Sequence, residues 1–388
     1  MRNPFVYGEE VVGESFIDRD DELRMLTKDI ESNERVFLIS PRRYGKTSLI
    51  VNLFGVLRGK RWLTARIDLY KATSLESLAN LYGVSVIHSI ESKPEKWIRF
   101  SKEFIPMLRP TITINPDGQP ELSLNLHPRE QNIELLLDKL YNLPEEIAVR
   151  HKKRVIIAFD EFQEIRTLNG EKIEKALRAN IQRHHNVSYI FAGSKKRMLY
   201  DMVSKPSSAF YKMGKVIHLN KINRKDFERF IINKFLQARI SISDDALGKI
   251  FTITEEIPYN IQFLCHQIWD KYYGQKKIII DDVEATIKDI AFGQTPIYTT
   301  IWDRLTLHQR RVLKAIADSG GKGIFSQDFR QQYGLGSPSS VQTSVNSLIS
   351  HEFLDRENDS YVFLDVFFKE WIRRRMSDFG PEQKMNRF

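Results

Sequence analysis

A short run of residues after an apolar segment has the composition of a phosphate-binding loop. The apolar segment is residues 36–39, and the run is Ser40, Pro41, Arg42, Arg43, Tyr44, Gly45, Lys46 and Thr47. An apolar strand, a tight turn ending in Gly-Lys-Thr and then a helix form the layout in which backbone N–H groups wrap a phosphate. Lys46 would reach the β- and γ-phosphates, and the Thr47 hydroxyl would ligate Mg²⁺. The full pattern begins with glycine where Ser40 stands, so this run alone does not decide the function.

Two carboxylates follow a second apolar run. Residues 154–159 end in Asp160 and Glu161. A run that is hydrophobic on both faces is typical of a buried parallel strand, and α/β sheets bind ligands at the carboxyl ends of their strands. In a nucleoside triphosphatase, Asp160 would hold Mg²⁺ through water and Glu161 would polarise the attacking water. The alternative is that both acids only cap the next helix, but the upstream loop favours the catalytic interpretation.

A third strand end completes the candidate site. Residues 187–192 form an apolar strand that ends at Gly193 and Ser194, where a polar side chain could sense the γ-phosphate. Three strand ends then converge on one nucleotide, which predicts a magnesium-dependent ATPase with ATP and Mg²⁺ as cofactors. The predicted catalytic residues are Glu161, Lys46 and Ser194, and the predicted metal ligands are Thr47 and Asp160. The predicted nucleotide-binding residues are Pro41, Arg42, Arg43, Tyr44, Gly45, Lys46, Thr47 and Ser48. Arg197 and Arg183 are candidates for an arginine that stabilises the transition state, although each is more easily explained as a surface arginine.

The order of the elements predicts the fold that holds these residues. Strands at residues 35–39, 63–68, 154–159, 187–192 and 215–219 alternate with helical segments, which indicates an α/β domain with a parallel sheet. Alternating residues at 111–114 and 121–126 flank a turn at 115–118 and predict a β-hairpin insertion at about 108–128. Residues 74–104 and 128–149 are predicted to be helical.

The second half of the chain predicts two smaller domains. Residues 224–289 are mainly helical. Three short helices at 307–318, 326–333 and 340–351, followed by a hairpin around residues 358–359, predict a winged helix. We therefore expect a P-loop ATPase domain at residues 1–220, a helical lid domain at 221–298 and a winged-helix domain at 299–388.

Composition limits the cellular compartments and the kinds of partner that we expect for this protein. The single cysteine, Cys265, excludes an intrachain disulfide and favours a reducing compartment. No signal peptide opens the chain and no apolar run is long enough to cross a bilayer, so we expect a cytoplasmic protein with no membrane contact. The formal net charge of +9 mildly favours polyanionic partners.

Taken together, these motifs give the chain a resemblance to a known family. It resembles the archaeal-type ATPases of the STAND class, near the AAA+ proteins and the origin-recognition initiators. The matching stretches are residues 16–23, 41–49, 159–163, 191–194 and 258–262, followed by the winged helix. The resemblance implies the same phosphate, metal, water-activating and sensor roles as above, and it adds an adenine-side contact at Pro258. The family usually has glycine at three positions where this chain has Ser40, Asp18 and Glu256.

Two functions from different classes remain open. The first is an ATP-hydrolysing switch whose nucleotide state controls docking of the winged helix or assembly. The second is a DNA-binding regulator or mobile-element protein in which nucleotide is mainly structural. The third winged-helix helix offers Gln342, Thr343 and Asn346 to DNA bases, yet residues 331–350 contain no Lys or Arg. Residues 302–388 hold 13 basic and 11 acidic residues, a net charge of +2. This is little positive charge with which to neutralise DNA phosphates. Double-stranded DNA, a homo-oligomer and a protein partner therefore all stay open.

Overall fold

The computed structural model describes residues 2–17, 19–91, 93–106, 108–126, 132–168, 170–357 and 359–378. The chain divides into two compact units, which are described separately. One unit is Tyr7–Phe227, and the other combines Met1–Val6 with Glu228–Phe388.

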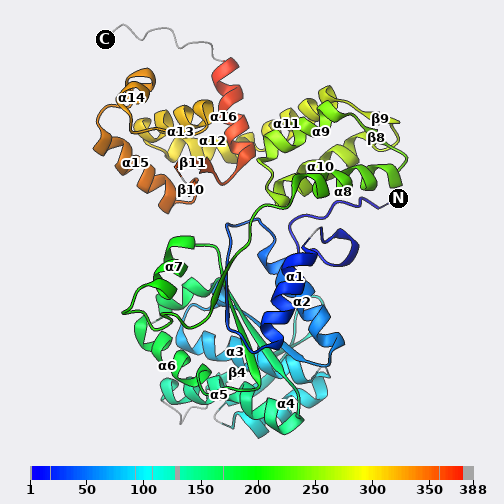
Figure 1. The fold of residues 1–388 in the computed structure, drawn as a ribbon, viewed down its shortest axis with the longest axis vertical. Helices are drawn as coiled ribbons and strands as arrows, with labels where there is room; N and C mark the ends of the chain where they lie inside the picture. Colours follow the sequence, from blue (N-terminus) through cyan, green and yellow to red (C-terminus); the bar gives the residue numbers. More distant parts are fainter. Residues whose placement is uncertain are drawn as a thin grey trace. The chain divides into compact units, whose positions relative to one another are not determined.

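A five-stranded parallel sheet forms the centre of the first unit (Figure 1). Its strand order is β2-β5-β6-β1-β7, so strands that are distant in sequence lie side by side. The strands are β1 (Val36–Ile39), β2 (Leu63–Asp68), β5 (Val155–Asp160), β6 (Val187–Gly193) and β7 (Lys215–His218). The expected α/β fold with a parallel sheet is confirmed.

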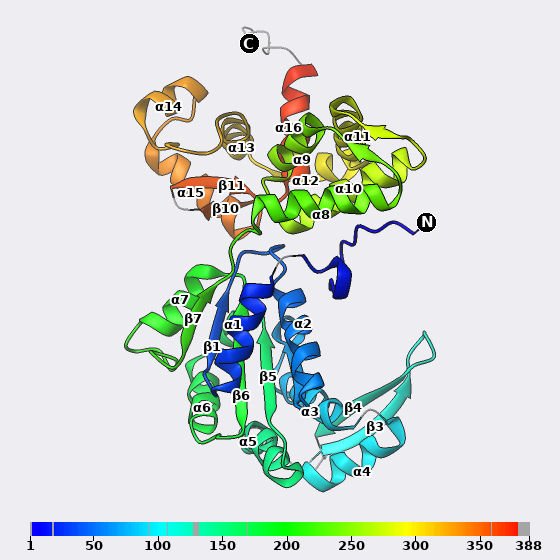
Figure 2. The same ribbon diagram turned by 45° about the vertical axis from the view of Figure 1, so that its right-hand side comes forward.

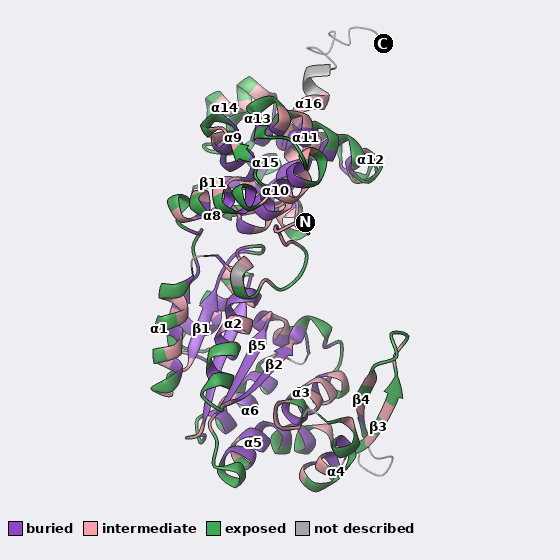
Figure 3. Ribbon diagram, turned by 90° about the vertical axis from the view of Figure 1, so that its right-hand side faces the viewer, coloured by how far each residue is buried: buried purple, intermediate pink, exposed green. Residues whose placement is uncertain are grey.

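Helices cover both faces of this sheet, so its central strands are buried on both sides (Figure 3). Alternate residues of β1 belong to different cores: Phe37 and Ile39 pack on one side, and Val36 and Leu38 pack on the other. This burial explains the continuous apolar runs in the sequence. The helices of this unit are α1 (Asp20–Glu31), α2 (Lys46–Gly59), α3 (Leu75–Ile90), α4 (Pro94–Phe104), α5 (Ile133–His151), α6 (Glu171–Ile181) and α7 (Lys196–Ser204), with short 3₁₀ turns η1 (Gly13–Ser15), η2 (Leu69–Lys71) and η3 (Phe162–Leu168).

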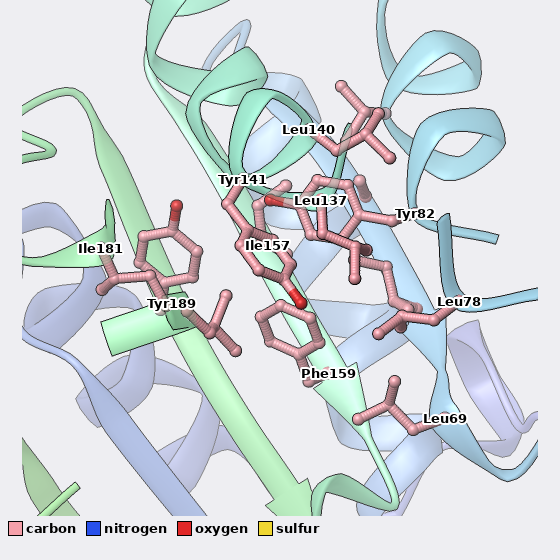
Figure 4. Close-up of a cluster of buried hydrophobic side chains, with 14 of the residues drawn as sticks. Leu69, Leu78, Tyr82, Leu137, Leu140, Tyr141, Ile157, Phe159, Ile181 and Tyr189 are labelled. Carbon is pink, nitrogen blue, oxygen red and sulfur yellow. The ribbon is translucent and has the colours of Figure 1, made fainter. Parts of the chain in front are cut away.

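The larger core lies between the sheet and helices α3 and α5 (Figure 4). Tyr82 of α3 meets Tyr141 of α5 edge to face, with ring centroids 5.6 Å apart, and Phe159 of β5 lies 6.0 Å from Tyr82. Aromatic pairs in this arrangement add to the stabilisation from burial alone. The strand that ends in Asp160 is therefore fixed in a rigid layer.

The predicted hairpin is present as β3 (Leu108–Ile114) paired antiparallel with β4 (Pro120–Leu126), and it extends away from the sheet (Figure 2). The helical conformation expected at residues 74–104 is present as two separate helices, α3 and α4. Pro94 occupies the first turn of α4, and a proline forces the residue before it out of the helical conformation. The start expected for the next helix, residues 128–131, lies outside the described residues, and α5 begins at Ile133.

The second unit starts with a helical region that includes the first residues of the chain. Phe5 is buried with its ring centroid 5.0 Å from that of Phe235, and Asn3 Nδ2 donates to Asp270 Oδ1 at 2.8 Å. This region contains α8 (Arg224–Gln237), α9 (Asp244–Thr254), α10 (Pro258–Tyr272) and α11 (Ile280–Gly293), and the short strands β8 (Ser241–Ile242) and β9 (Lys277–Ile278).

A winged helix follows the helical region. The three expected helices and the hairpin are present as α13 (Leu307–Ser319), α14 (Gln327–Tyr333), α15 (Pro338–Ser350), β10 (Leu354–Glu357) and β11 (Ser360–Phe363). Two further helices, α12 (Thr295–Arg304) and α16 (Val366–Asp378), flank them and were not predicted. Trp371 of α16 packs against Trp302 and Tyr298 of α12, which joins the first and last helices of this region. Within the described ranges, no helix is both long and apolar enough to span a membrane.

Candidate functional site

The three predicted strand ends meet at one edge of the sheet. Strands β1, β6 and β5 are adjacent and parallel, with β6 in the middle. Because parallel strands share one direction, the residues that follow them lie at the same edge. Ser194 after β6 therefore stands between the loop after β1 and the carboxylates at the end of β5.

The loop after β1 has the backbone geometry of a tight turn into a helix. Ser40 is fully buried, its N–H donates to the Gly193 carbonyl at 3.2 Å, and its hydroxyl donates to the Pro41 carbonyl at 3.0 Å. A side chain is therefore accommodated where the usual pattern has glycine. Gly45 has φ +86°, a left-handed conformation that other residues adopt only with strain. The Leu49 N–H makes a helical bond to the Gly45 carbonyl, so the N–H groups before it are those that can hold an anion.

The first residues of α2 contact the carboxylates directly. Lys46 Nζ donates to Glu161 Oε1 at 2.7 Å and lies 3.4 Å from Asp160 Oδ1. Thr47 Oγ1 donates to Asp160 Oδ2 at 2.9 Å. Lys46 and Asp160 are both buried, so this ion pair is shielded from solvent. Two motifs separated by residues 48–159 of the chain thus form one cluster.

Glu161 is the most connected side chain of the cluster. Its Oε2 accepts hydrogen bonds from Gln163 Nε2 at 2.6 Å and from Ser194 Oγ at 2.7 Å. Burial opposes ionisation of this carboxyl, but the Lys46 charge and the hydrogen bonds from Lys46, Gln163 and Ser194 outweigh it, and they lower its pKa to about 2. Glu161 also has φ +49°, a left-handed conformation that costs on the order of 1 kcal/mol in a residue with a side chain. A carboxylate held by this many contacts has a fixed position.

Two residues that contact the site were not predicted. Gln163 follows the carboxylates and is fully buried. Arg19 is also buried, and its guanidinium donates to the Tyr44 carbonyl in the loop at 3.4 Å and to the Asn220 carbonyl after β7 at 2.5 Å. Arg19 therefore ties the loop to the end of β7. No sequence spacing reveals either contact, because each depends on how the strands pair.

The remaining loop and helix residues vary in their exposure. Arg42 and Arg43 are exposed, whereas Pro41, Tyr44 and Ser48 are buried. The Ser48 hydroxyl accepts the Val11 N–H at 3.0 Å, and Asn52 Nδ2 donates to the Val11 carbonyl at 2.9 Å. The segment before α1 is thus fixed beside the start of α2, and Ser48 has a structural partner within the chain.

Two predicted arginines make no hydrogen bond or ion pair with this cluster among the described residues, and Pro258 belongs to the other unit. Arg183 precedes β6, so it lies at the opposite edge of the sheet, where it donates to Asn180 Oδ1 at 2.8 Å. Arg197 lies in the first turn of α7 after Ser194. Pro258 begins α10 in the other unit, and its contact with adenine stays a prediction. Asp18, one of the departures from the family pattern, lies outside the described residues.

The oxygen atoms at the site suit a hard cation. Mg²⁺ prefers oxygen ligands and is usually held by one or two carboxylates together with phosphate oxygens and water. The Thr47 hydroxyl and the Asp160 carboxylate come from different elements and meet at 2.9 Å, which provides such a pair. Among the described residues, the structure brings together no group of three or more His, Cys, Asp and Glu side chains that could hold a metal ion. The residues present therefore fit a magnesium ion that is bound together with a phosphate ligand.

Comparison with known proteins agrees with this architecture. A family model described as a probable winged helix domain matches residues 296–374. A search of curated proteins finds no match. Among solved structures, the chain is similar to the Walker-type ATPase PABY2304 of Pyrococcus abyssi, with 18% identity, a TM-score of 0.63, and coverage of 95% of this chain and 99% of that one. It is also similar to the ORC1 protein of Aeropyrum pernix, solved in complex with DNA, with 11% identity, a TM-score of 0.53 and coverage of 96% of each chain.

At these identities the likeness shows a shared fold. The chain has the fold of a P-loop ATPase, with a parallel sheet, a helical region and a C-terminal winged helix. The resemblance stated from the sequence is therefore confirmed at the level of the fold.

Proposed function

We propose that the protein binds ATP with Mg²⁺ at the loop after β1 and hydrolyses its terminal phosphate bond. One observation carries this proposal: Lys46, Thr47, Asp160, Glu161 and Ser194 come from three strand ends, and each is hydrogen-bonded to another member of this set. These are the group types that a phosphoryl transfer to water needs: a cation, oxygen ligands for a metal, a base and a polar donor.

Each residue has a defined task in the proposed reaction. The backbone N–H groups at the start of α2 and the Lys46 ammonium hold the phosphates. Thr47 and Asp160 hold Mg²⁺, which supplies charge neutralisation to the phosphate oxygens. Glu161 accepts a proton from water as the water oxygen bonds to the γ-phosphorus. The bond from that phosphorus to the bridging oxygen breaks, and ADP leaves with the electron pair.

The ion pair between Lys46 and Glu161 is a route by which ATP binding would change the basicity of Glu161. In the structure the Lys46 ammonium is within hydrogen-bond distance of Glu161. A bound triphosphate competes for the same ammonium, and the Glu161 carboxylate then loses its nearest cation. Loss of a neighbouring positive charge raises the pKa of a carboxyl group, so ATP binding makes Glu161 a stronger base.

The wider proposal is that nucleotide state acts as a switch. We propose an ATPase domain at residues 1–220, a helical lid at 221–298 with Pro258 facing the adenine, and a winged-helix domain at 299–388. ATP hydrolysis would control docking of the winged helix or assembly with a protein partner or further copies. A cytoplasmic setting fits the single cysteine, which is buried.

Double-stranded DNA is the second candidate partner. The exposed side chains of Gln342, Thr343 and Asn346 on α15 favour it, and the ORC1 neighbour was solved with DNA. The same helix contains no basic residue, and phosphate neutralisation supplies most DNA affinity. We expect binding no tighter than about 1 µM at physiological salt, measured by fluorescence anisotropy of a labelled duplex in a salt titration. Nanomolar affinity would favour the DNA-binding function, and an absence of binding at low salt would exclude that function.

Calorimetric titration of the full chain with ATP tests the main proposal. In the presence of Mg²⁺ we expect one site per chain, with affinity at least about tenfold higher than with EDTA, because the metal neutralises phosphate charge beside Asp160. AMP, which lacks the β- and γ-phosphates that Lys46 would contact, serves as the control ligand and should bind at least about tenfold more weakly than ATP. Equal affinity for ATP and AMP would contradict a site built on the loop.

A further inference from the structure

The buried amide of Gln163 makes an asymmetric set of contacts beside the site. Gln163 lies in η3, two residues after Glu161, and is fully buried. Its Nε2 donates to Glu161 Oε2 at 2.6 Å and more weakly to Glu164 Oε1 at 3.4 Å. Glu161 has a left-handed backbone conformation, and the Gln163 side chain reaches back to its carboxylate.

The other end of this amide has no hydrogen bond. Gln163 Oε1 is buried and has no hydrogen-bond partner among the described residues. Exchanging the amide oxygen and nitrogen would place a carbonyl oxygen against the Glu161 carboxylate, which is repulsive, so the orientation is fixed. Leaving a buried acceptor unpaired is unfavourable, and an apolar side chain would fill the same space without that loss. The hydrogen bond that Gln163 Nε2 donates to Glu161 is therefore the interaction that favours an amide at this position.

Gly193 provides the room that this amide requires. A Cβ atom on residue 193 would lie 2.1 Å from Gln163 Oε1 and 2.6 Å from Leu199 Cδ1. Both distances are far below van der Waals contact. A side chain at this position would displace the Gln163 amide, Leu199 or the backbone of β6. The glycine before Ser194 is thus explained by a close approach between β6 and η3.

ATP binding is expected to break some of the hydrogen bonds to Glu161 and to leave others in place. In the proposed reaction the Lys46 ammonium is drawn to the phosphates, and we propose that Ser194, expected to sense the γ-phosphate, turns towards it as well. Gln163 is the buried donor that stays on the carboxylate when they do. We propose that Gln163 is a positioning residue that orients Glu161 towards the attacking water, and that Gly193 is required to let it do so. This inference rests on the proposed ATPase function.

Kinetics of the Gln163→Met variant test the positioning role. Methionine keeps the length of the side chain and removes the donor. We expect kcat for ATP hydrolysis to fall about 10- to 100-fold, since a small misplacement of a catalytic group has effects of this size, while KM for ATP changes less than about threefold. The matched control is Asn180→Leu, which removes a buried amide that bonds Asp138 Oδ1 at 2.7 Å outside the site. That control should lower the melting temperature and leave kcat unchanged.

The Gly193→Ala variant tests the spatial requirement independently. It should reproduce the loss in kcat, and the double variant with Gln163→Met should be no worse than Gln163→Met within about twofold, because both changes remove one contact. An unchanged kcat in Gln163→Met, or effects that multiply in the double variant, would overturn the inference.

Crystal structures of the nucleotide-free chain separate this inference from the proposed function. If the wild-type protein hydrolyses no ATP, the proposed function fails, but the position of Glu161 is still measurable. Lys46→Met removes the ion pair that ATP would draw away, so the comparison is made between Lys46→Met and the double variant Lys46→Met with Gln163→Met. We expect the Glu161 carboxylate to stay beside Gln163 in Lys46→Met and to move in the double variant. A carboxylate in the same place in both variants would overturn the positioning role whatever the activity.

Discussion

Replacing Glu161 with glutamine is expected to lower kcat for ATP hydrolysis by about 100-fold or more, because a general base contributes about 10²- to 10⁴-fold. Glutamine keeps the shape of the side chain but cannot accept the proton of the attacking water. ATP binding should change less than about threefold, since the phosphates are held by the loop and Lys46 rather than by this carboxylate. A coupled assay of steady-state ADP release measures both quantities.

Glu171→Gln is the matched control for this experiment. Glu171 is an exposed acid of the same unit and pairs with Lys175 at 3.0 Å on α6. It should hydrolyse ATP at the wild-type rate. If Glu161→Gln keeps more than half of the wild-type kcat, another group activates the water and the assignment of Glu161 is wrong.

Replacing Lys46 with methionine should weaken ATP binding by about 100-fold, because removing one partner of a buried charge pair typically loses 2–5 kcal/mol. Methionine retains the buried stem and removes only the cation. Titration calorimetry against ATP and Mg²⁺ measures the loss. Lys60→Met is the control, since Lys60 is exposed and pairs with Glu31 away from the site. Binding within about threefold of wild type in Lys46→Met would contradict the role of the loop.

The same variant has a predicted pH signature without nucleotide. In the wild type, the pKa of Glu161 is lowered to about 2, so its ionisation stabilises the fold above pH 4.5 and this contribution is lost as pH falls towards 2. Removing Lys46 raises that pKa, so the variant should be less stable than wild type at neutral pH. The difference in melting temperature should shrink as the medium becomes more acid, because protonation removes the charge that Lys46 balances.

Local patterns were sufficient to locate most of the candidate site. The loop residues adjoin each other in the chain, and Asp160, Glu161 and Ser194 directly follow apolar strands. Parallel strands bring their carboxyl ends to one edge, so sequence order alone predicted that these residues meet. The strand order, with β6 between β1 and β5, then fixed the contact between Ser194 and Glu161.

Contacts that depend on packing could not be predicted in this way. Gln163 and Arg19 are polar residues whose roles come from partners on other elements, Glu161 for the first and the Tyr44 carbonyl for the second. Arg183 was a candidate for the arginine that stabilises the transition state, but it precedes β6 and lies at the opposite edge. A residue's position before or after a strand, and not its distance along the chain, decides which edge it occupies.

Some helix boundaries, and the packing of the last helix, also could not be predicted from local sequence patterns. The break between α3 and α4 depends on Pro94, whereas the apolar residues continue on both sides of it. Helix α16 has the positive run Arg373, Arg374 and Arg375, yet its Trp371 is buried against α12. The basic residues of α16 therefore gave no indication of the apolar face by which this helix packs against α12.

A single-turnover experiment with γ-³²P-labelled ATP shows directly whether the protein hydrolyses ATP at this site. The full chain is held in excess over ATP with Mg²⁺, so product release cannot limit the signal. We expect release of labelled phosphate in the wild type, no release with EDTA, and bound but intact ATP in Glu161→Gln. Wild-type protein that binds ATP and releases no phosphate would contradict ATP hydrolysis, and Glu161→Gln protein that releases phosphate at the wild-type rate would contradict the role of Glu161.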